Sequence, residues 1–353
     1  MNQVSRAVPQ GREAVLDEIL DALAEVGEVV ITTHANADGD GAGSEAGLAW
    51  FLRRMGVAAW IVNPTPYPER YAFLLGDPEW VVAASGAEAR DLCRRAGLAV
   101  VVDTNDVRRI GRVARLIRGL PKVVIDHHRP SARAIEGLVL ADPAACATGQ
   151  LVFELIERAG VPLCREIASA LYTAILTDTG GFRFENTDPA CLRTAAVLVE
   201  AGAEPGSLHR VSYSGHRLRR FRLLRSALAT LEVASEGRSS GRVASMIVPK
   251  AEYDRLGATP DDLEGFVDVP RDVEGVEVAI LHRTTTDGRI KVSLRSVAPV
   301  DVHRIAAELG GGGHLRAAAA VVAGPLESAV RDVARRVERA LPDAPATPHD
   351  SGA

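Results

Sequence analysis

The chain has 353 residues, a net charge of −5, a mean hydropathy of +0.05 and 47% hydrophobic residues, a composition that predicts a soluble globular protein long enough for two domains. The negative charge excludes a broad basic footprint, and the aromatic fraction of 4% argues against a base-stacking platform, so we expect any nucleic-acid partner to be short. The four cysteines form no C-x-x-C pair, and we find neither a leader-like segment nor an apolar run that could span a membrane, so we expect a reduced, cytoplasmic protein without a membrane partner.

Apolar periodicity predicts that helices and strands alternate through the first half of the chain. Some segments repeat apolar residues at helical spacing, and short unbroken apolar runs lie between them. The predicted helices are 13–26, 44–55, 87–96 and 106–118, and the predicted strands are 29–33, 57–62, 98–102 and 123–125. This alternation favours an α/β fold built on a parallel sheet with right-handed crossovers.

The stretch after the first predicted strand carries one imidazole and two carboxylates within seven residues, namely His34, Asp38 and Asp40, on what we expect to be a turn loosened by glycine. Two carboxylates this close repel each other unless one holds a proton or a cation lies between them. Nitrogen and oxygen ligands suit manganese, magnesium, iron or zinc. Taken alone, the stretch fits equally well an aspartate that only caps the following helix.

Further acidic residues and histidines follow other predicted strands. Asp103 comes directly after strand 98–102, and a triplet that begins at Asp126 comes directly after strand 123–125. Parallel sheets bind ligands at the carboxyl ends of their strands, so we expect these side chains to meet at one edge, where clustered aspartate and histidine indicate a metal site. The candidate residues are His34, Asp38, Asp40, Asp103, Asp126, His127, His128 and Asp178.

The second half of the chain begins with helices and then changes character. Strand-like runs alternate with turns, and 286–288 (Thr-Asp-Gly) is a typical hairpin signal. Four glycines and a histidine occupy 310–314, and from the residues alone a flexible loop is the simplest interpretation. The predicted helices are 148–159, 164–177, 188–202, 217–231, 301–308 and 325–340, and the predicted strands are 242–248, 276–282, 289–295 and 316–322.

The ordered set of motifs resembles the DHH phosphoesterases over about residues 12–340. The stretch from His34 to Asp40, then Asp103, then the Asp126-His127-His128 triplet and finally Asp178 match the four motifs of that family in order. The glycine-histidine run, together with 265–271 and 291–296, is similar to the DHHA1 domain of one branch, the compact oligoribonuclease type. The resemblance implies an N-terminal parallel-sheet DHH domain with flanking helices (12–190), a helical linker (191–232), a smaller C-terminal α/β DHHA1 domain (233–341) and a disordered tail (342–353).

By position, the resemblance implies a centre of two manganese ions, for which magnesium could substitute. The implied ligands are His34 and Asp38 for the first ion, Asp40, His127 and Asp178 for the second, and Asp103 as the bridge. The implied catalytic residues are His128, which would steady the phosphate or handle a proton, Asp126, which would orient the histidines, and Asp103. The implied substrate-binding residues are Arg295, Gly311, Gly312, Gly313 and His314.

Three positions depart from the family pattern without touching a predicted ligand. Ala37 stands where proline is frequent, Asp268 where this branch often has asparagine, and Ala319 where a glycine usually closes the glycine-histidine motif. The change at Asp268 could alter contacts to a base or a ribose, and the change at Ala319 could alter one wall of the binding loop.

The activity implied by the resemblance is manganese-dependent hydrolysis of short RNA oligonucleotides to 5′-mononucleotides, or dephosphorylation of 3′-phosphoadenosine-5′-phosphate, by water attack at two metals. A phosphodiesterase for cyclic di-AMP or pApA stays open, because these molecules present a phosphate ester to the same metals. A pyrophosphatase and a long-substrate exonuclease are less favoured. The alternative outside the enzymes is a nucleotide-binding module that uses Gly39-x-Gly41-x-Gly43, although this spacing departs from G-x-G-x-x-G. The sequence leaves the oligomeric state open, a homodimer included.

Overall fold

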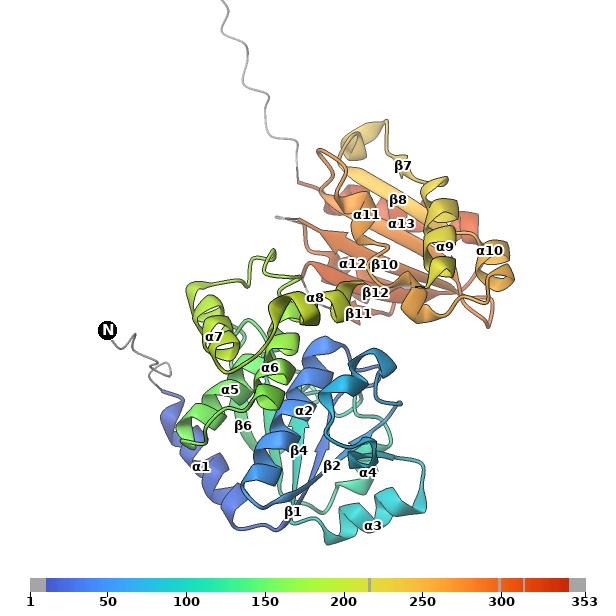
Figure 1. Ribbon diagram of the computed structural model, residues 1–353. Helices are drawn as coiled ribbons and strands as arrows, with labels where there is room; N and C mark the ends of the chain where they lie inside the picture. The colour runs from blue at the N-terminus through green and yellow to red at the C-terminus, as the bar shows by residue number, and fades with distance from the viewer. Residues whose placement is uncertain (1–10, 215–216, 298–299, 314, 343–353) are drawn as a thin grey trace, which may run out of the picture. The chain divides into compact units, whose positions relative to one another are not determined.

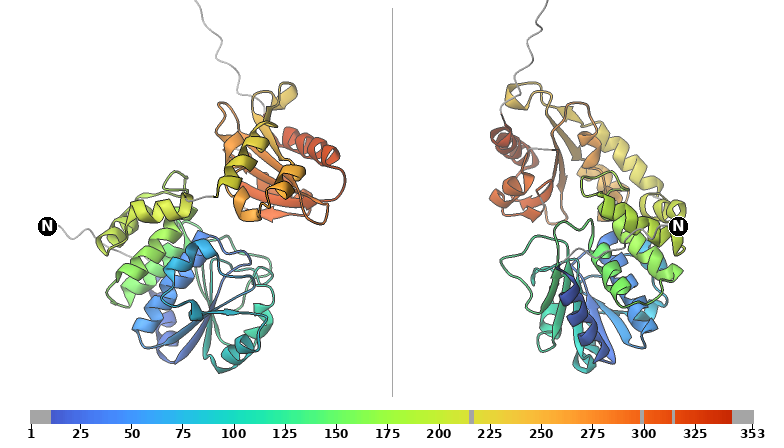
Figure 2. Two further views of the ribbon diagram at one scale, coloured as in Figure 1. Left: turned by 45° about the vertical axis from the view of Figure 1, so that its right-hand side comes forward. Right: turned by 90° about the vertical axis from the view of Figure 1, so that its left-hand side faces the viewer.

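The computed structural model describes residues 11–214, 217–297, 300–313 and 315–342, which belong to two compact units divided at Gly215 (Figures 1 and 2). The predicted substrate-binding residue His314 and all but the first residue of the predicted tail 342–353 lie outside the described residues. Across the described ranges, we find no helix with the length and apolar character that a bilayer crossing requires.

The first unit is built on a parallel six-stranded sheet in the spatial order β3-β2-β1-β4-β5-β6. The sheet confirms the predicted α/β fold, and the strand order reverses between β1 and β4, where parallel sheets of this kind bind ligands. The short strands β3 and β6 were not predicted. The strands are β1 (Glu28–Thr32), β2 (Ala58–Asn63), β3 (Val81–Ala83), β4 (Leu98–Val102), β5 (Lys122–Asp126) and β6 (Leu138–Ala141).

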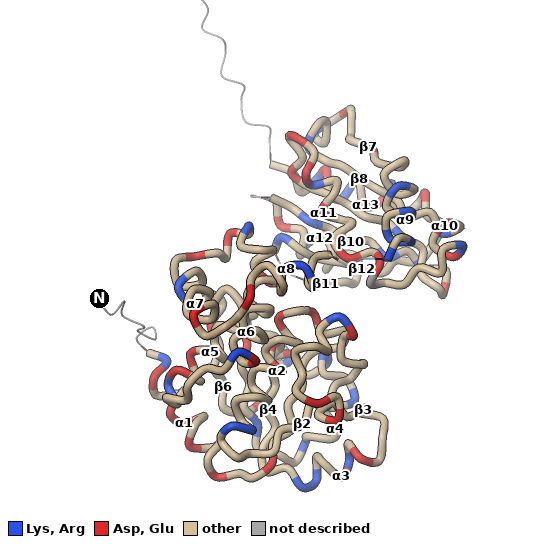
Figure 3. The backbone as a smooth tube through the Cα atoms, viewed as in Figure 1, with Lys and Arg blue, Asp and Glu red and all other residues tan. Residues whose placement is uncertain are grey.

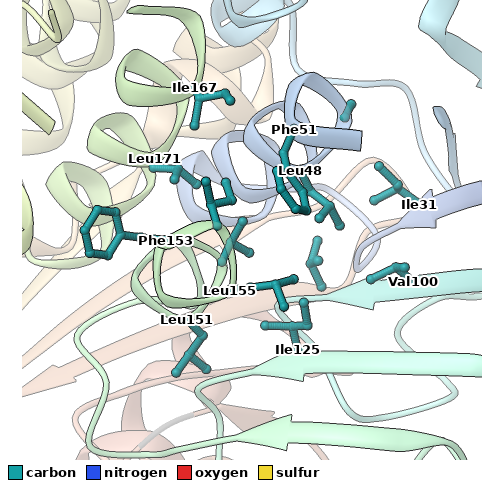
Figure 4. Packing of buried hydrophobic residues seen from close by; sticks show 14 of the residues in the cluster. Ile31, Leu48, Phe51, Val100, Ile125, Leu151, Phe153, Leu155, Ile167 and Leu171 are labelled. Atoms are coloured by element: carbon teal, nitrogen blue, oxygen red, sulfur yellow. The ribbon is translucent and has the colours of Figure 1, made fainter. Parts of the chain in front are cut away.

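Successive residues of the strands enter two different cores, one on each face of the sheet. Val29 and Ile31 face the core formed with α1, α2, α5 and α6, whereas Val30 faces the core formed with α3 and α4. Figure 4 shows the first of these cores, which contains Ile31 of β1 and Leu48 of α2. The helices of the unit are α1 (Glu13–Ala24), α2 (Gly39–Arg54), α3 (Ala87–Arg95), α4 (Val113–Leu116), α5 (Thr148–Arg158), α6 (Arg165–Asp178), α7 (Pro189–Glu200) and α8 (Pro205–Tyr213), with 3-10 turns η1 (Glu69–Leu74) and η2 (Pro78–Trp80).

Helix α2 begins five residues before the predicted start, so the glycines after Asp38 lie in a helix and the expected turn was wrong. They let α2 approach α6 closely, since a Cβ atom on Gly43 would lie 2.5 Å from the carbonyl oxygen of Ala170 and one on Gly47 2.6 Å from a methyl group of Leu171. Glycine is therefore needed at these positions for helix packing. This removes the main argument for a cofactor loop.

The predicted helix 106–118 was largely wrong, because only α4 is helical there. Asp106 accepts hydrogen bonds from the backbone N–H of Arg108 at 2.8 Å and from the hydroxyl of Ser131 at 2.9 Å, and its carboxylate also pairs with the Arg108 guanidinium. Side-chain bonds of this kind offer the backbone an alternative to a helix. Apolar periodicity gives no information about such side-chain hydrogen bonds.

The second unit has a mixed sheet in the order β11-β12-β10-β9-β8-β7, in which only the β8–β9 pair is parallel within the described residues. One face packs on α12 and α13, and the other packs in part on α9 and α11. Helix α9 thus belongs to this unit, whereas α7 and α8 pack in the first. The elements are β7 (Glu232–Val233), β8 (Val243–Val248), β9 (Val278–Thr284), β10 (Ile290–Ser296), β11 (Gly312–Gly313), β12 (Ala317–Val322), α9 (Leu218–Leu228), α10 (Lys250–Arg255), α11 (Asp268–Arg271), α12 (Val302–Glu308), α13 (Leu326–Ala340), η3 (Gly237–Ser239) and η4 (Pro260–Leu263).

Candidate metal centre

Three adjacent strands deliver the candidate residues to one edge of the first sheet. His34 lies two residues past the end of β1, Asp103 comes directly after β4, and Asp126 is the last residue of β5. Asp103 has a φ of 60°, a left-handed backbone conformation that non-glycine residues rarely adopt. Such conformations persist only where the surrounding structure holds them, and they concentrate at functional sites.

The first group of possible ligands consists of His34, Asp38 and Asp103. The Nε2 atom of His34 lies 3.3 Å from Oδ2 of Asp103 and 3.7 Å from Oδ2 of Asp38. The other oxygen of Asp38, Oδ1, accepts the backbone N–H groups of Asp40 and Gly41 at 3.1 Å each. Asp38 therefore caps α2 with one oxygen and faces His34 with the other, so a role as helix cap and a role as metal ligand are compatible.

The second group consists of Asp40, His127 and Asp178. The Nε2 atom of His127 lies 3.7 Å from Oδ2 of Asp40 and 3.7 Å from Oδ2 of Asp178, the last residue of α6. Asp40 also accepts the backbone N–H groups of Thr148 at 2.7 Å and of Gly149 at 2.9 Å, which belong to the N-terminal end of α5. The positive end of that helix stabilises the buried carboxylate.

Asp103 lies between the two groups and faces each with a different oxygen. Its Oδ2 faces His34, while its Oδ1 lies 3.8 Å from Nε2 of His127 and 3.5 Å from Nδ1 of His128. The hydroxyl of Thr148 donates to Oδ1 at 3.2 Å. Because the Asp103 side chain is 2% exposed, its charge needs compensation from its neighbours.

The electrostatics of the site favour cations. Burial raises the pKa of Asp103, and the nearby carboxylates of Asp40 and Asp38 raise it further. Burial by itself would lower the pKa of His34, but the carboxylates of Asp103 and Asp38 outweigh it and raise the pKa to about 10. In the same way, Asp40 and the other carboxylates raise the pKa of His127 to about 9. Without a cation, crowded carboxylates retain protons or protonate the histidines, and a divalent ion can replace those protons.

The ring nitrogens of both histidines suit a metal. Nδ1 of His34 lies 3.0 Å from the carbonyl oxygen of Ala35, and Nδ1 of His127 lies 3.3 Å from that of Ala145. A carbonyl only accepts, so each Nδ1 keeps its proton, and each Nε2 would offer a lone pair to a cation that replaces the proton there. The buried Nε2 of His34 makes no hydrogen bond to any described residue. The donor set therefore fits divalent ions, although the individual ligand roles stay predictions.

His128 is held beside the two groups by Asp126. Its Nδ1 lies 2.7 Å from Oδ1 of Asp126, which also accepts the His128 backbone N–H at 3.1 Å. Oδ2 of the fully buried Asp126 accepts the side-chain N–H of Asn105 at 2.5 Å. Asn105 and Thr148 were not among the predicted site residues. The only sequence signals for them are the place of Asn105 two residues after Asp103 and that of Thr148 at a helix start.

The predicted substrate-binding residues lie in the second unit. Arg295 of β10 alternates with core residues, and its Nε lies 3.8 Å from Oδ1 of Asp268. The same oxygen lies 3.1 Å from Nη1 of Arg271. The unusual aspartate at 268 thus lies between two arginines and partly neutralises them, where an asparagine would leave both charges in place.

Two residues of the glycine run, Gly312 and Gly313, form β11 and pair with β12. A Cβ atom on Gly313 would lie 2.5 Å from the carbonyl oxygen of Ala317, and one on Gly311 would lie 2.6 Å from the Cα atom of Ala320. A Cβ atom on Gly312 would meet no described atom within 4 Å. The close backbone approach expected for a ligand is therefore made to β12 at Gly311 and Gly313, and of these three predicted binding glycines Gly312 is the one with open space around it.

Comparisons with known proteins agree with this arrangement. The DHH family N-terminal domain matches residues 28–175, and the DHHA1 domain matches residues 242–342. The bifunctional oligoribonuclease and PAP phosphatase NrnA of Thermus thermophilus is 33% identical over 92% of this chain and 93% of its own length. The cyclic-di-AMP phosphodiesterase GdpP of Geobacillus thermodenitrificans is 27% identical over 88% of this chain, which spans 48% of that protein. An exopolyphosphatase-related protein from Bacteroides fragilis has a TM-score of 0.87 at 27% identity, covering 94% of this chain and 98% of the other.

Proposed function

The chain belongs to the DHH family of phosphoesterases, with a DHHA1 domain after the DHH domain, and from that premise we propose that it is a manganese-dependent cytoplasmic enzyme acting on short RNA. Its reaction is the hydrolysis of oligoribonucleotides to 5′-mononucleotides, together with removal of the 3′-phosphate of 3′-phosphoadenosine-5′-phosphate. The name of the relative from Thermus thermophilus, which matches over nearly the whole chain, supports both activities.

The single observation that carries the proposal is the position of Asp103. One of its oxygens faces His34 and the other faces His127, so one carboxylate can serve two cations at once. The first ion would be held by His34 and Asp38, the second by Asp40, His127 and Asp178, and Asp103 would bridge them. When bound, such a pair of ions supplies a deprotonated water near neutral pH and neutralises charge on the phosphate.

The remaining side chains of the site would position the substrate phosphate and give a proton to the leaving group. Asp126 holds His128 through Nδ1, so Nε2 is the atom that would contact a phosphate oxygen or give a proton to the leaving group. Asn105 and the buried position of Asp126 fix this orientation. Arg295 and the open backbone at Gly312 would bind the rest of the substrate.

Metal removal and return tests the proposal. Protein stripped with a chelator is expected to hydrolyse neither RNA of two to five nucleotides nor 3′-phosphoadenosine-5′-phosphate, and manganese should restore both activities. Because the ions bind only the folded state, manganese should also raise the melting temperature. Turnover that persists in chelator would contradict the two-metal mechanism, and metal-independent binding of NAD would favour a nucleotide-binding module instead.

A second candidate is a phosphodiesterase for cyclic di-AMP, favoured by the similarity to GdpP. The same metals would act on its phosphate esters, so only rates separate the candidates. In a side-by-side manganese assay we expect kcat/KM to be higher for short RNA and for 3′-phosphoadenosine-5′-phosphate. A higher kcat/KM for cyclic di-AMP would assign the second function.

A further inference from the structure

A hollow of about 560 Å³ in the first unit is lined by three arginines, Arg90, Arg112 and Arg115. Arg90 projects from the first turns of α3, and the other two come from the segment that runs into and through α4. The remaining wall is small or uncharged, and consists of Ala84, Ser85, Gly111 and Leu116. Among the residues that the structure describes, no acidic one lines the hollow.

The three arginines have no carboxylate partner among the described residues. Arginines close to them do, since Arg94 pairs with Asp91 and Arg108 pairs with Asp106. The segment 106–118 carries five arginines and a single aspartate, in a chain whose net charge is −5. Figure 3 shows positive and negative positions interspersed over much of the rest of the chain, apart from a second arginine-rich segment at 217–225 in the other unit. Like charges gathered around one hollow without counter-charges favour an anion there, and guanidinium groups match phosphate oxygens.

The hollow lies at the same edge of the sheet as the candidate metal centre. Ala84 and Ser85 directly follow β3, and Gly111 lies in the segment after β4, where a Cβ atom on it would lie 3.2 Å from Cβ of Pro64 in the loop after β2. All of these loops leave carboxyl ends of parallel strands. The carbonyl oxygen of Arg109 accepts the backbone N–H of Ala35 at 2.8 Å, so the arginine segment is bonded to the residue directly after His34.

The separation along this edge suits an oligonucleotide. Strands β3 and β4 are three positions apart in the sheet, which corresponds to roughly 14 Å at about 4.8 Å per strand. A stacked strand advances about 3.4 Å per nucleotide, so roughly four nucleotides span this distance, and fewer do so in an extended chain. Building on the proposed function, we infer that the hollow binds the phosphate backbone of the part of an RNA substrate that extends away from the scissile bond. It would give preference to RNA of several nucleotides over mononucleotides.

The test uses the double variant Arg112→Ala/Arg115→Ala and substrates of different length. For a five-nucleotide RNA, KM should rise about tenfold, and the slope of log KM against log salt should fall by about 1.4 as two phosphate contacts are lost. For 3′-phosphoadenosine-5′-phosphate, which is too short to reach the hollow, kcat and KM should stay within about twofold of the wild type. Arg118→Ala removes a charge of the same segment from outside the hollow, and KM should stay unchanged for both substrates. The charge-conserving variant Arg112→Lys/Arg115→Lys should recover most of the salt dependence.

Two outcomes would overturn the inference. Unchanged KM and salt slope for the five-nucleotide RNA would do so, as would an equal change for RNA and for 3′-phosphoadenosine-5′-phosphate. The proposed function is tested separately on the wild-type protein, by chelation, manganese return and the comparison of substrates, so its failure can be told apart from a failure of this inference.

Discussion

The two units bury histidines in opposite electrostatic settings. In the first unit, buried His34 and His127 face several carboxylates, which overcome the effect of burial and raise their pKa values to about 10 and about 9. In the second unit, His282 of β9 is fully buried, neither ring nitrogen bonds to a described residue, and burial lowers its pKa to about 4. A buried histidine is therefore no sign of a site by itself, and the convergence of carboxylates on it is what distinguishes a metal centre from a core.

The difference follows from the two sheets. A parallel sheet brings the carboxyl ends of all its strands to one edge, so residues far apart in sequence, such as His34 and Asp103, meet there. The second sheet is mixed, and its strand ends point to both edges. Its charged residues, such as Arg295, lie along a strand between core residues instead. The first arrangement concentrates charge for chemistry, whereas the second spreads it over a face suited to binding.

Replacing Asp103 should have the largest effect, because Asp103 joins the two groups of charged residues in the first unit. The variant Asp103→Ala removes the carboxylate that faces both groups, so kcat/KM should fall by roughly 10⁴-fold, as for other residues that act as a unit. The rise in melting temperature on adding manganese should also disappear. Asp126→Asn, which alters the hydrogen bonds of Asp126 to His128 and Asn105 but removes no predicted metal ligand, should cost about 10–100-fold. Near-normal turnover of Asp103→Ala would refute the bridging role.

The sequence was sufficient to predict this charged edge, because strand ends and acidic residues can both be seen in it. All eight candidate residues of the first unit are linked to one another by side-chain atom pairs no more than 3.8 Å apart. The helix start at Thr148 was predicted, but its place in the site was not, because that depends on hydrogen bonds to Asp40 and Asp103, which are distant in sequence. The conformation of the segment after Asp103 also depends on a distant partner, Ser131. The packing role of Gly43 also could not be predicted, since glycine is required there because α6 approaches closely.

Arg295→Ala tests whether the second unit binds substrate, and its effect on kcat/KM should be smaller than that of Asp103→Ala. Loss of a charge-assisted bond to phosphate should raise KM by roughly 10–100-fold while kcat changes little, which is the signature of lost uniform binding. The matched control is Arg289→Ala, directly before the first residue of the same strand, where the arginine pairs with exposed Asp287. Steady-state kinetics on 3′-phosphoadenosine-5′-phosphate measure both parameters. A fall confined to kcat would assign Arg295 to the chemistry instead.

Replacing His282 should have the smallest effect, and only in acid. Its pKa in the folded protein, about 4, lies below the value of about 6.5 expected in the unfolded chain, so the unfolded state binds more protons between these values. The free energy of unfolding is therefore not reduced by His282 above about pH 6.5. It decreases as the pH falls toward 4, by about 1.4 kcal/mol at pH 5.5.

His282→Leu removes this dependence, so the difference in unfolding free energy between variant and wild type should change with pH only in that window. All three tryptophans lie in the first unit, so hydrogen exchange of peptides from β9 and β10 is the suitable measurement. Comparing both proteins at each pH cancels the titration of the carboxylates in the first unit, which they share. Parallel stability curves from pH 7 to pH 4 would mean that His282 finds a partner when protonated, and the contrast between the two units would then be smaller than the structure indicates.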